Sequence, residues 1–121
     1  MSMKTWWQSI FATNQELEAE ELVEEALEAG SQVIKNVADG QVSTLSGTVR
    51  ALVLRPEVGV PALEVELFDG SGTVCVIWLG RRHIAGIAPG ISLAVTGRLV
   101  RQDGRLAMFN PQYSILAKGQ S

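Results

Sequence analysis

A hairpin signature in the middle of the chain constrains the fold more than any other feature. Residues 62–68 and 73–79 alternate apolar and polar side chains, and the turn sequence Asp69-Gly70-Ser71-Gly72 joins them. This turn sets the register of the hairpin, so that one face carries only apolar side chains: Leu63 opposite Trp78, Val65 opposite Val76 and Leu67 opposite Val74. Because such a face is buried, we expect Trp78 in the core and Glu64 and Glu66 facing outward.

The same alternation predicts three more strands. They cover residues 42–54, 91–101 and 105–110, the last two joined by the turn Asp103-Gly104. Residues 80–90 interrupt the pattern and allow one short helical turn around residues 82–85. Three strands, an insert and two further strands is the order of the OB fold, and Gly47 and Gly97 fit the bends of its small barrel. We therefore expect an all-β fold, a five-stranded OB-fold barrel with an acidic N-terminal α-helix.

The N-terminal third differs in pattern and charge. Thr13-Asn14-Gln15-Glu16 is a capping-box signature, and from there to Ala29 glutamates alternate with an apolar stripe at helical spacing. Residues 1–41 carry two basic and eight acidic side chains, whereas residues 42–121 carry eight basic and five acidic ones. The helix either covers one end of the barrel through Leu22, Val23, Ala26 and Leu27, or occupies a basic groove as an internal phosphate mimic.

These differences divide the chain into an N-terminal segment, residues 1–40, and the barrel, residues 41–118. The stretch before the helix contains Trp6, Trp7, Ile10 and Phe11, which form an apolar stripe at helical spacing. We expect this N-terminal aromatic segment to pack on the barrel or on another copy of the chain.

Several classes of protein are excluded by the sequence. The apolar run of residues 74–79 is too short to cross a membrane and no signal-peptide pattern occurs, so we expect a cytoplasmic protein without membrane contact. One cysteine, Cys75, permits neither an internal disulfide nor a multi-thiolate zinc site. No phosphate-cradling glycine loop, nucleophile elbow or metal-ligand spacing is present, and we expect no enzymatic activity, cofactor or metal.

Four stretches resemble a known family. They are VSTLSGTV from Val42, LEVELFDGSGTVCVIWLG from Leu63, PGISLAVTGRLV from Pro89 and MFNPQY from Met108. Over roughly residues 32–116 the chain is similar to OB-fold domains of the anticodon-binding type, and most similar to the wedge OB domain of the RecG branch-migration helicase. The acidic helix resembles instead that of small stand-alone OB proteins of actinobacteria. The resemblance implies nucleic-acid binding without the helicase motor, and so without ATP-driven movement.

Basic and aromatic residues mark a candidate binding site. The register around Asp103-Gly104 places Arg98 opposite Phe109 and Gln102 opposite Arg105, so that both arginines share a face with the aromatic ring. Arginines bind phosphates and aromatic rings stack on bases. We expect single-stranded nucleic acid, DNA or RNA, to bind with low sequence specificity. The candidate residues are Arg98, Arg105, Phe109, Arg81, Arg82, Arg55 and Phe68.

The outer face of the second and third strands also supports a different hypothesis. Glu64 and Glu66 would repel phosphates there unless Arg50 neutralises one of them, and Ile77 and Leu79 make the face partly apolar. The alternative function is a protein-interaction or oligomerisation module. It would bind a protein partner or a second copy through this face or through the N-terminal aromatic segment.

Overall fold

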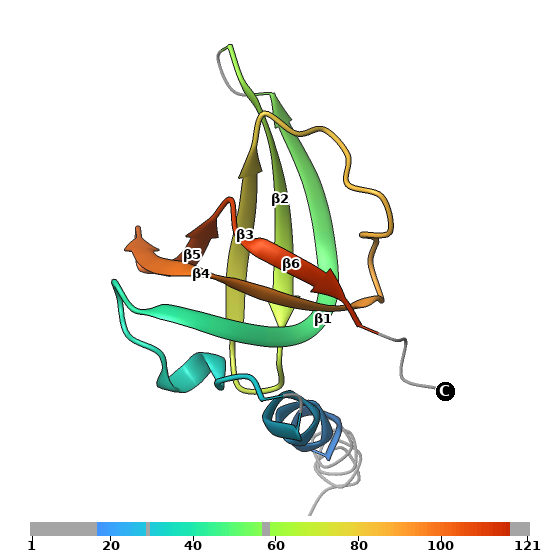
Figure 1. Cartoon of the computed structure of the whole chain (residues 1–121), viewed down its shortest axis with the longest axis vertical. Helices are drawn as coiled ribbons and strands as arrows, with labels where there is room; N and C mark the ends of the chain where they lie inside the picture. Colours follow the sequence, from blue (N-terminus) through green and yellow to red (C-terminus); the bar gives the residue numbers. More distant parts are fainter. Residues whose placement is uncertain (1–16, 29, 57–58, 117–121) are drawn as a thin grey trace, which may run out of the picture.

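The computed structural model describes residues 17–28, 30–56 and 59–116, and the chain is mostly β (Figure 1). A helix occupies residues 17–28, followed by a short 3-10 helix, η1 (Ile34–Asn36). The strands are β1 (Val42–Pro56), β2 (Pro61–Phe68), β3 (Thr73–Leu79), β4 (Ser92–Gln102), β5 (Arg105–Phe109) and β6 (Gln112–Ile115). The N-terminal aromatic segment and the capping box lie outside the described residues.

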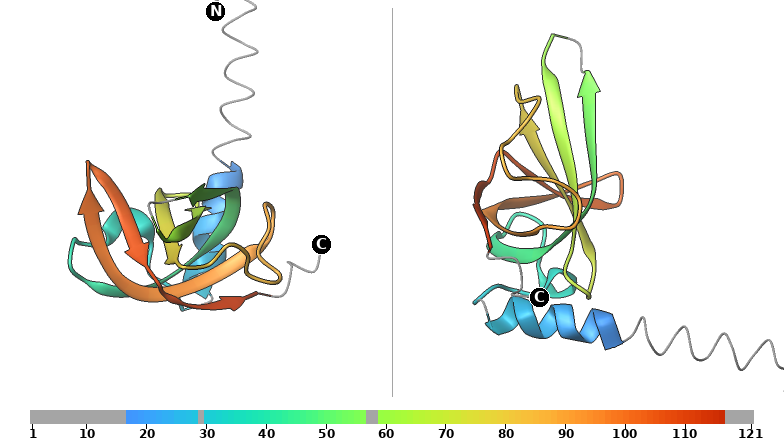
Figure 2. Two further views of the ribbon diagram at one scale, coloured as in Figure 1. Left: turned by 90° about the horizontal axis from the view of Figure 1, so that it is seen from above. Right: turned by 90° about the vertical axis from the view of Figure 1, so that its right-hand side faces the viewer.

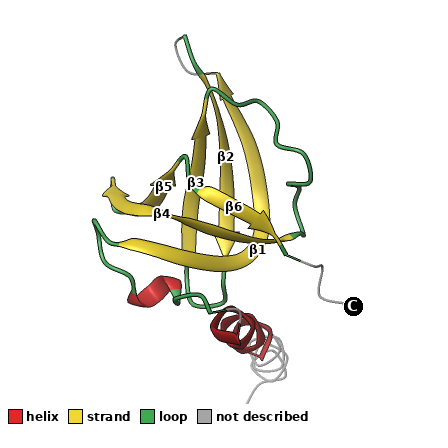
Figure 3. Cartoon of the chain, viewed as in Figure 1, coloured by secondary structure: helices red, strands yellow, loops and turns green. Residues whose placement is uncertain are grey.

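Five strands close into a ring in the order β1-β2-β3-β5-β4, with β4 returning to β1 (Figure 3). All pairs are antiparallel except the parallel pair β3–β5. The expected register of the β2–β3 hairpin is confirmed, with Leu63 opposite Trp78. Residues 42–48 of β1 pair with β4, while residues 48–56 pair with β2, so that β1 bends from one part of the ring into the other.

The core fills the inside of this ring. Leu63, Val65, Leu67 and Trp78 are buried as expected, and Glu64 and Glu66 lie on the other face of β2. The expected helical turn at residues 82–85 is wrong, because residues 80–90 contain no helix. This loop instead packs Ile84 and Ile87 into the core, and a turn joins the two residues through a hydrogen bond from Ile87 N to Ile84 O of 3.1 Å.

The C-terminal strand β6 was not expected from the sequence. Pro111 and the positive φ of Asn110, 49°, end β5, and the chain then continues along the same edge of β4. Leu99 pairs with Met108 and Thr96 with Gln112, so that the C-terminal chain carries one extra residue between the two pairs. This displacement allows Tyr113 to meet the core ring of Trp78 edge-on, at a centroid separation of 5.7 Å.

The acidic helix lies across the end of the ring where β2 turns into β3 (Figure 2). Ala26 is buried against the ring and Leu22 and Val23 are partly buried, but Leu27 is 56% exposed, so the expected apolar stripe is narrower than predicted. Gly70 has a φ of +93°, and a Cβ there would collide with the carbonyl of Ala19. The helix therefore covers one end of the ring. No helix among the described residues combines the length and apolarity needed to cross a membrane.

Asp69 is the most heavily bonded side chain in the region that joins helix and ring. It is fully buried, and its Oδ2 accepts a hydrogen bond of 2.8 Å from Ile34 N at the start of η1. Its Oδ1 accepts hydrogen bonds from Ser71 N at 2.8 Å, Ser71 Oγ at 2.7 Å and Gly72 N at 3.1 Å. One carboxylate thus holds the β2–β3 turn and attaches η1 to it.

Candidate nucleic-acid interface

A groove crosses the outer face of the ring, opposite the core. Its volume is ≈ 290 Å³ and it takes residues from β1, β2, β3 and the β4–β5 hairpin. The residues of this outer groove are Arg55, Glu64, Cys75, Ile77, Gln102, Asp103, Arg105 and Ala107. Ile77 and Ala107 belong to a small apolar cluster separate from the core, and they give the groove an apolar floor.

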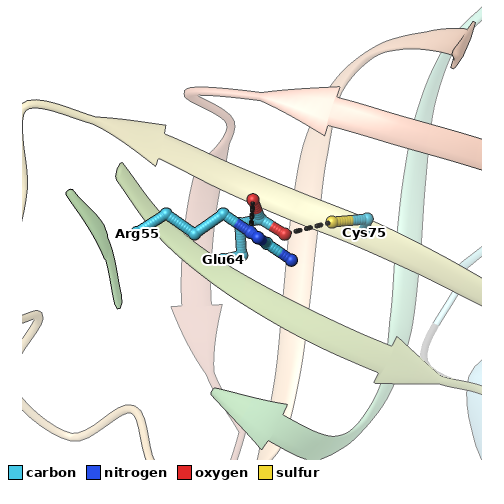
Figure 4. Close-up of polar contacts among 3 residues, drawn as sticks. All are labelled: Arg55, Glu64 and Cys75. Atoms are coloured by element: carbon cyan, nitrogen blue, oxygen red, sulfur yellow. Dashed lines mark hydrogen bonds and ion pairs between the residues drawn. The ribbon is translucent and has the colours of Figure 1, made fainter. Parts of the chain in front are cut away.

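Arg55 and Glu64 form an ion pair at one side of the outer groove (Figure 4). Arg55 Nε lies 2.5 Å from Glu64 Oε2, and Cys75 Sγ donates a weak hydrogen bond to Glu64 Oε1 at 3.6 Å. The sequence interpretation offered Arg50 as the side chain that neutralises Glu64 or Glu66. For Glu64 this role falls to Arg55, and the Arg50 guanidinium lies 3.5 Å from the centroid of the Phe68 ring. The pair with Arg55 offsets the repulsion that Glu64 would exert on a phosphate.

Arg105 stands at the other side of the outer groove and also borders a second hollow. This hollow has a volume of ≈ 310 Å³, and its lining includes Cys75, Arg101, Gly104 and Arg105. Arg105 and Arg55 belong to β5 and β1, the strands on either side of the β2–β3 hairpin. Two arginines therefore flank the apolar floor of Ile77 and Ala107, and two carboxylates, Glu64 and Asp103, line the same groove, so that its formal charges balance.

The candidate residues from the sequence do not all meet. Arg55 and Arg105 line the outer groove, and Phe109, 36% exposed, extends the same face of β5 beside Ile77. The expected pair of Arg98 with Phe109 is not part of the β4–β5 ladder, which ends at Leu99 and Met108. Arg98 pairs with Val42 on β1, and its Nη1 donates a hydrogen bond of 2.6 Å to Gly40 O.

Three other candidates lie outside the outer groove. Arg81 and Arg82 are exposed in the loop of residues 80–90 and do not line it. Phe68 lies beneath Arg50, so that the guanidinium takes the position in which a base would stack. The sequence analysis also missed Gln102 as a groove residue, although the expected pairing of Gln102 with Arg105 contained that signal, and this pairing is confirmed.

The thiol of Cys75 is held in its neutral form by its surroundings. Burial, the largest cause, and the negative charge of Glu64 raise the pKa of Cys75 from 9.0 to about 11. At pH 8 only about one thousandth of this thiol is ionised, and the thiolate is the nucleophile. Cys75 is therefore an unreactive part of the groove floor at neutral pH.

Alkylation of Cys75 is expected to show this pKa directly. The rate at which iodoacetamide alkylates the native protein should still be rising with pH above 10. The rate for the urea-unfolded chain should level off above about pH 9. Glu64→Gln removes the negative charge but not the burial, so the midpoint should fall and remain above that of the unfolded chain. A native midpoint near 9 would contradict the assigned environment.

No set of three or more His, Cys, Asp or Glu side chains in the described part of the chain is arranged to hold a metal ion. The sequence matches no protein-family model and no curated protein.

Proposed function

We propose that the five-stranded ring is an OB-type barrel and that the protein binds single-stranded nucleic acid, without catalysis, in the outer groove. The ring order β1-β2-β3-β5-β4 and the parallel β3–β5 pair support this fold assignment. OB folds bind oligonucleotides across their second and third strands, and the outer groove crosses β2 and β3.

The observation that carries the proposal is the apolar floor between Arg55 and Arg105. A single strand presents flat, apolar bases along one side and phosphates along the other, which suits such a groove. Phe109 offers an exposed ring at the end of β5 on which a base can stack. Arg105 binds phosphate, and Arg55 retains free guanidinium donors because its pair with Glu64 engages Nε.

The number of available arginines predicts weak binding with modest salt dependence. Two or three phosphate contacts to single-stranded nucleic acid give a slope of log K against log salt of about −1.4 to −2.1. The proposed contacts are phosphate binding and base stacking, which carry little sequence information, so sequence specificity is expected to be low. Arg81 and Arg82 would contact phosphates only where a longer strand leaves the groove.

Fluorescence anisotropy with labelled single-stranded oligonucleotides at low salt tests the proposal. Arg105→Glu is expected to weaken binding by about tenfold or more, because a phosphate contact becomes a repulsion. Lys35→Glu makes the same charge change on η1, outside the groove, and is expected to have little effect. Equal losses in the two variants, or no binding by the wild-type protein at low salt, would reject the outer groove as a nucleic-acid site.

The same face supports a second candidate, the docking of a protein partner. Val53 and Leu79 are 45% and 47% exposed, and they lie beside Glu64 and Ala62 in the β1–β2 and β2–β3 ladders. Apolar side chains at the centre of a surface are typical of protein interfaces. A protein that binds no oligonucleotide at low salt would favour this candidate.

A further inference from the structure

Half of β1 has a free edge. One edge of β1 pairs with β4 through residues 42–48, and Val49 then exchanges hydrogen bonds with the loop before β4, at 3.0 Å to Ile91 O and 2.7 Å from Gly90 N. Beyond Val49 no described residue pairs with this edge, although β1 continues to Pro56. In Figure 1 this part of β1 rises beside β2, and the loop of residues 80–90 passes to its right on the way from β3 to β4.

The pattern of hydrogen bonds identifies the backbone groups on this edge. Gly80 N donates to Pro61 O, and Asp69 N donates to Gly72 O. The backbone N–H and C=O groups of odd-numbered residues in β2 therefore point toward β3, and those of even-numbered residues point toward β1. The even-numbered residues Glu64 and Ala62 are opposite Val53 and Arg55. The backbone groups of Leu52 and Leu54 therefore point away from β2, toward the free edge.

The side chains on this edge are apolar and exposed. Leu52, Val53 and Leu54 are 37%, 45% and 48% exposed. Leu52 and Leu54 share a face with the buried residues Val65 and Leu63, opposite which they lie. Natural sheet edges are protected by charges, prolines, bulges or covering segments. On this edge the bulge and charge of Arg50 and the charge of Arg55 beside Pro56 stand at the two ends, and residues 52–54 between them carry neither a charge nor a proline.

We propose that a second copy of this chain pairs with this edge, antiparallel, with Val53 opposite Val53 of the second copy. In this register Leu52 lies opposite Leu54 of the second copy, and the two exchange the backbone hydrogen bonds that the free edge offers. The leucines then extend the apolar face of Val65 and Leu63 across the interface. A continuous sheet through two copies results.

Backbone chemistry favours this register over its neighbours. The register places Arg55 of the second copy opposite Ala51, between Arg50 of the same strand and Glu66, which is two strands and about 10 Å away, so that an opposite charge lies near Arg55 as well as a like one. In the proposed register Pro56, which has no N–H to donate, lies opposite Arg50 at the end of the pairing, whereas centring the pair on Leu54 would put it opposite Leu52, next to the centre. Centring it on Leu52 would put Arg55 opposite Val49, whose backbone groups already bond to the loop before β4.

Sedimentation equilibrium of the full-length chain, without nucleic acid, tests the pairing. The wild type is expected to dimerise at micromolar concentration, and Leu54→Lys should raise the dissociation constant roughly tenfold or more, because it buries a charge at the interface. Leu79→Lys changes a side chain of similar exposure on β3, away from the free edge, and should leave the dimer intact. Circular dichroism confirms that each variant is folded.

A disulfide trap tests the register itself. Residues of a non-hydrogen-bonded antiparallel pair have Cα atoms about 4.5 Å apart, which a disulfide can bridge. In a Cys75→Ala background, Val53→Cys is expected to yield covalent dimers on mild oxidation, and Leu79→Cys is not. A monomeric wild type overturns the proposal, as does a dimer unaffected by Leu54→Lys or not trapped through residue 53. Because no oligonucleotide is present, these results are independent of the proposed binding function.

Discussion

Replacing Asp69 with alanine is expected to lower the free energy of unfolding by about 3 kcal/mol, measured by urea denaturation. The carboxylate is fully buried and accepts hydrogen bonds from the backbone N–H groups of Ile34, Ser71 and Gly72. Alanine leaves these donors without their acceptor, and bonds to a charged group are worth more than neutral ones. The loss also releases η1 from the β2–β3 turn, on which the acidic helix rests.

Asp39→Ala is the matched control. Asp39 also accepts a backbone hydrogen bond through its carboxylate, from Arg101 N at 3.0 Å, but it is exposed and water can replace it. Its expected cost is below about 1 kcal/mol. Similar midpoints for the two variants would show that the buried network of Asp69 contributes no special stability.

The second large effect is expected at Gly47, in the part of β1 that crosses the end of β2. A Cβ on Gly47 would collide with the carbonyl oxygen of Phe68 and lie 2.8 Å from its carbonyl carbon, so the backbone of one strand would have to move. Gly47→Ala should therefore lower the free energy of unfolding by about 2–3 kcal/mol. The close approach of β1 to β2 explains the glycine without any unusual φ.

Gly97 supplies the comparison because it is also a glycine within a strand. A Cβ there would meet Met108 side-chain atoms at 3.0 and 3.2 Å, and a methionine side chain can shift to relieve the contact. Gly97→Ala is expected to cost about 1 kcal/mol, the low end of the range for overpacking, because no backbone atom has to move. The order of the two urea midpoints is the critical result, and the reverse order would contradict the contacts assigned to these glycines.

The sequence predicts those parts of this fold that depend on residues close to one another in the sequence. The β2–β3 and β4–β5 hairpins follow from turn residues and from alternation over a few positions, and both registers are confirmed. Strand β6 alternates polar and apolar residues, but it is only four residues long and follows directly after Pro111, so the pattern is too short to mark a separate strand. The position of the acidic helix on the ring depends on a contact between Ala19 and Gly70, which are far apart in the sequence, so local patterns do not predict it.

The part of the candidate site that lies on β1 was harder to predict because of a bulge. The register of β1 against β2 shifts between Val49 and Ala51, at Arg50. An added residue sends each later side chain to the opposite face. Arg55 consequently meets Glu64 while Arg50 meets Phe68, and neither contact follows from alternation alone.

The closure of the ring between β1 and β4 has a consequence for the order of folding. Val42 pairs with Arg98 and Thr48 with Ser92, so the first strand to be synthesised waits for the fourth. At about 5–20 residues per second, a ribosome needs roughly 3–10 s to add the intervening residues. During that interval β1, β2 and β3 can form a meander, but residues 42–48 of β1 lack their partner strand, β4. Folding dominated by such distant pairs takes milliseconds to seconds even for a finished chain. Until the last third of the chain has been synthesised, the sheet of β1, β2 and β3 therefore has unpaired strand edges and an exposed apolar face, through which the nascent protein can mispair.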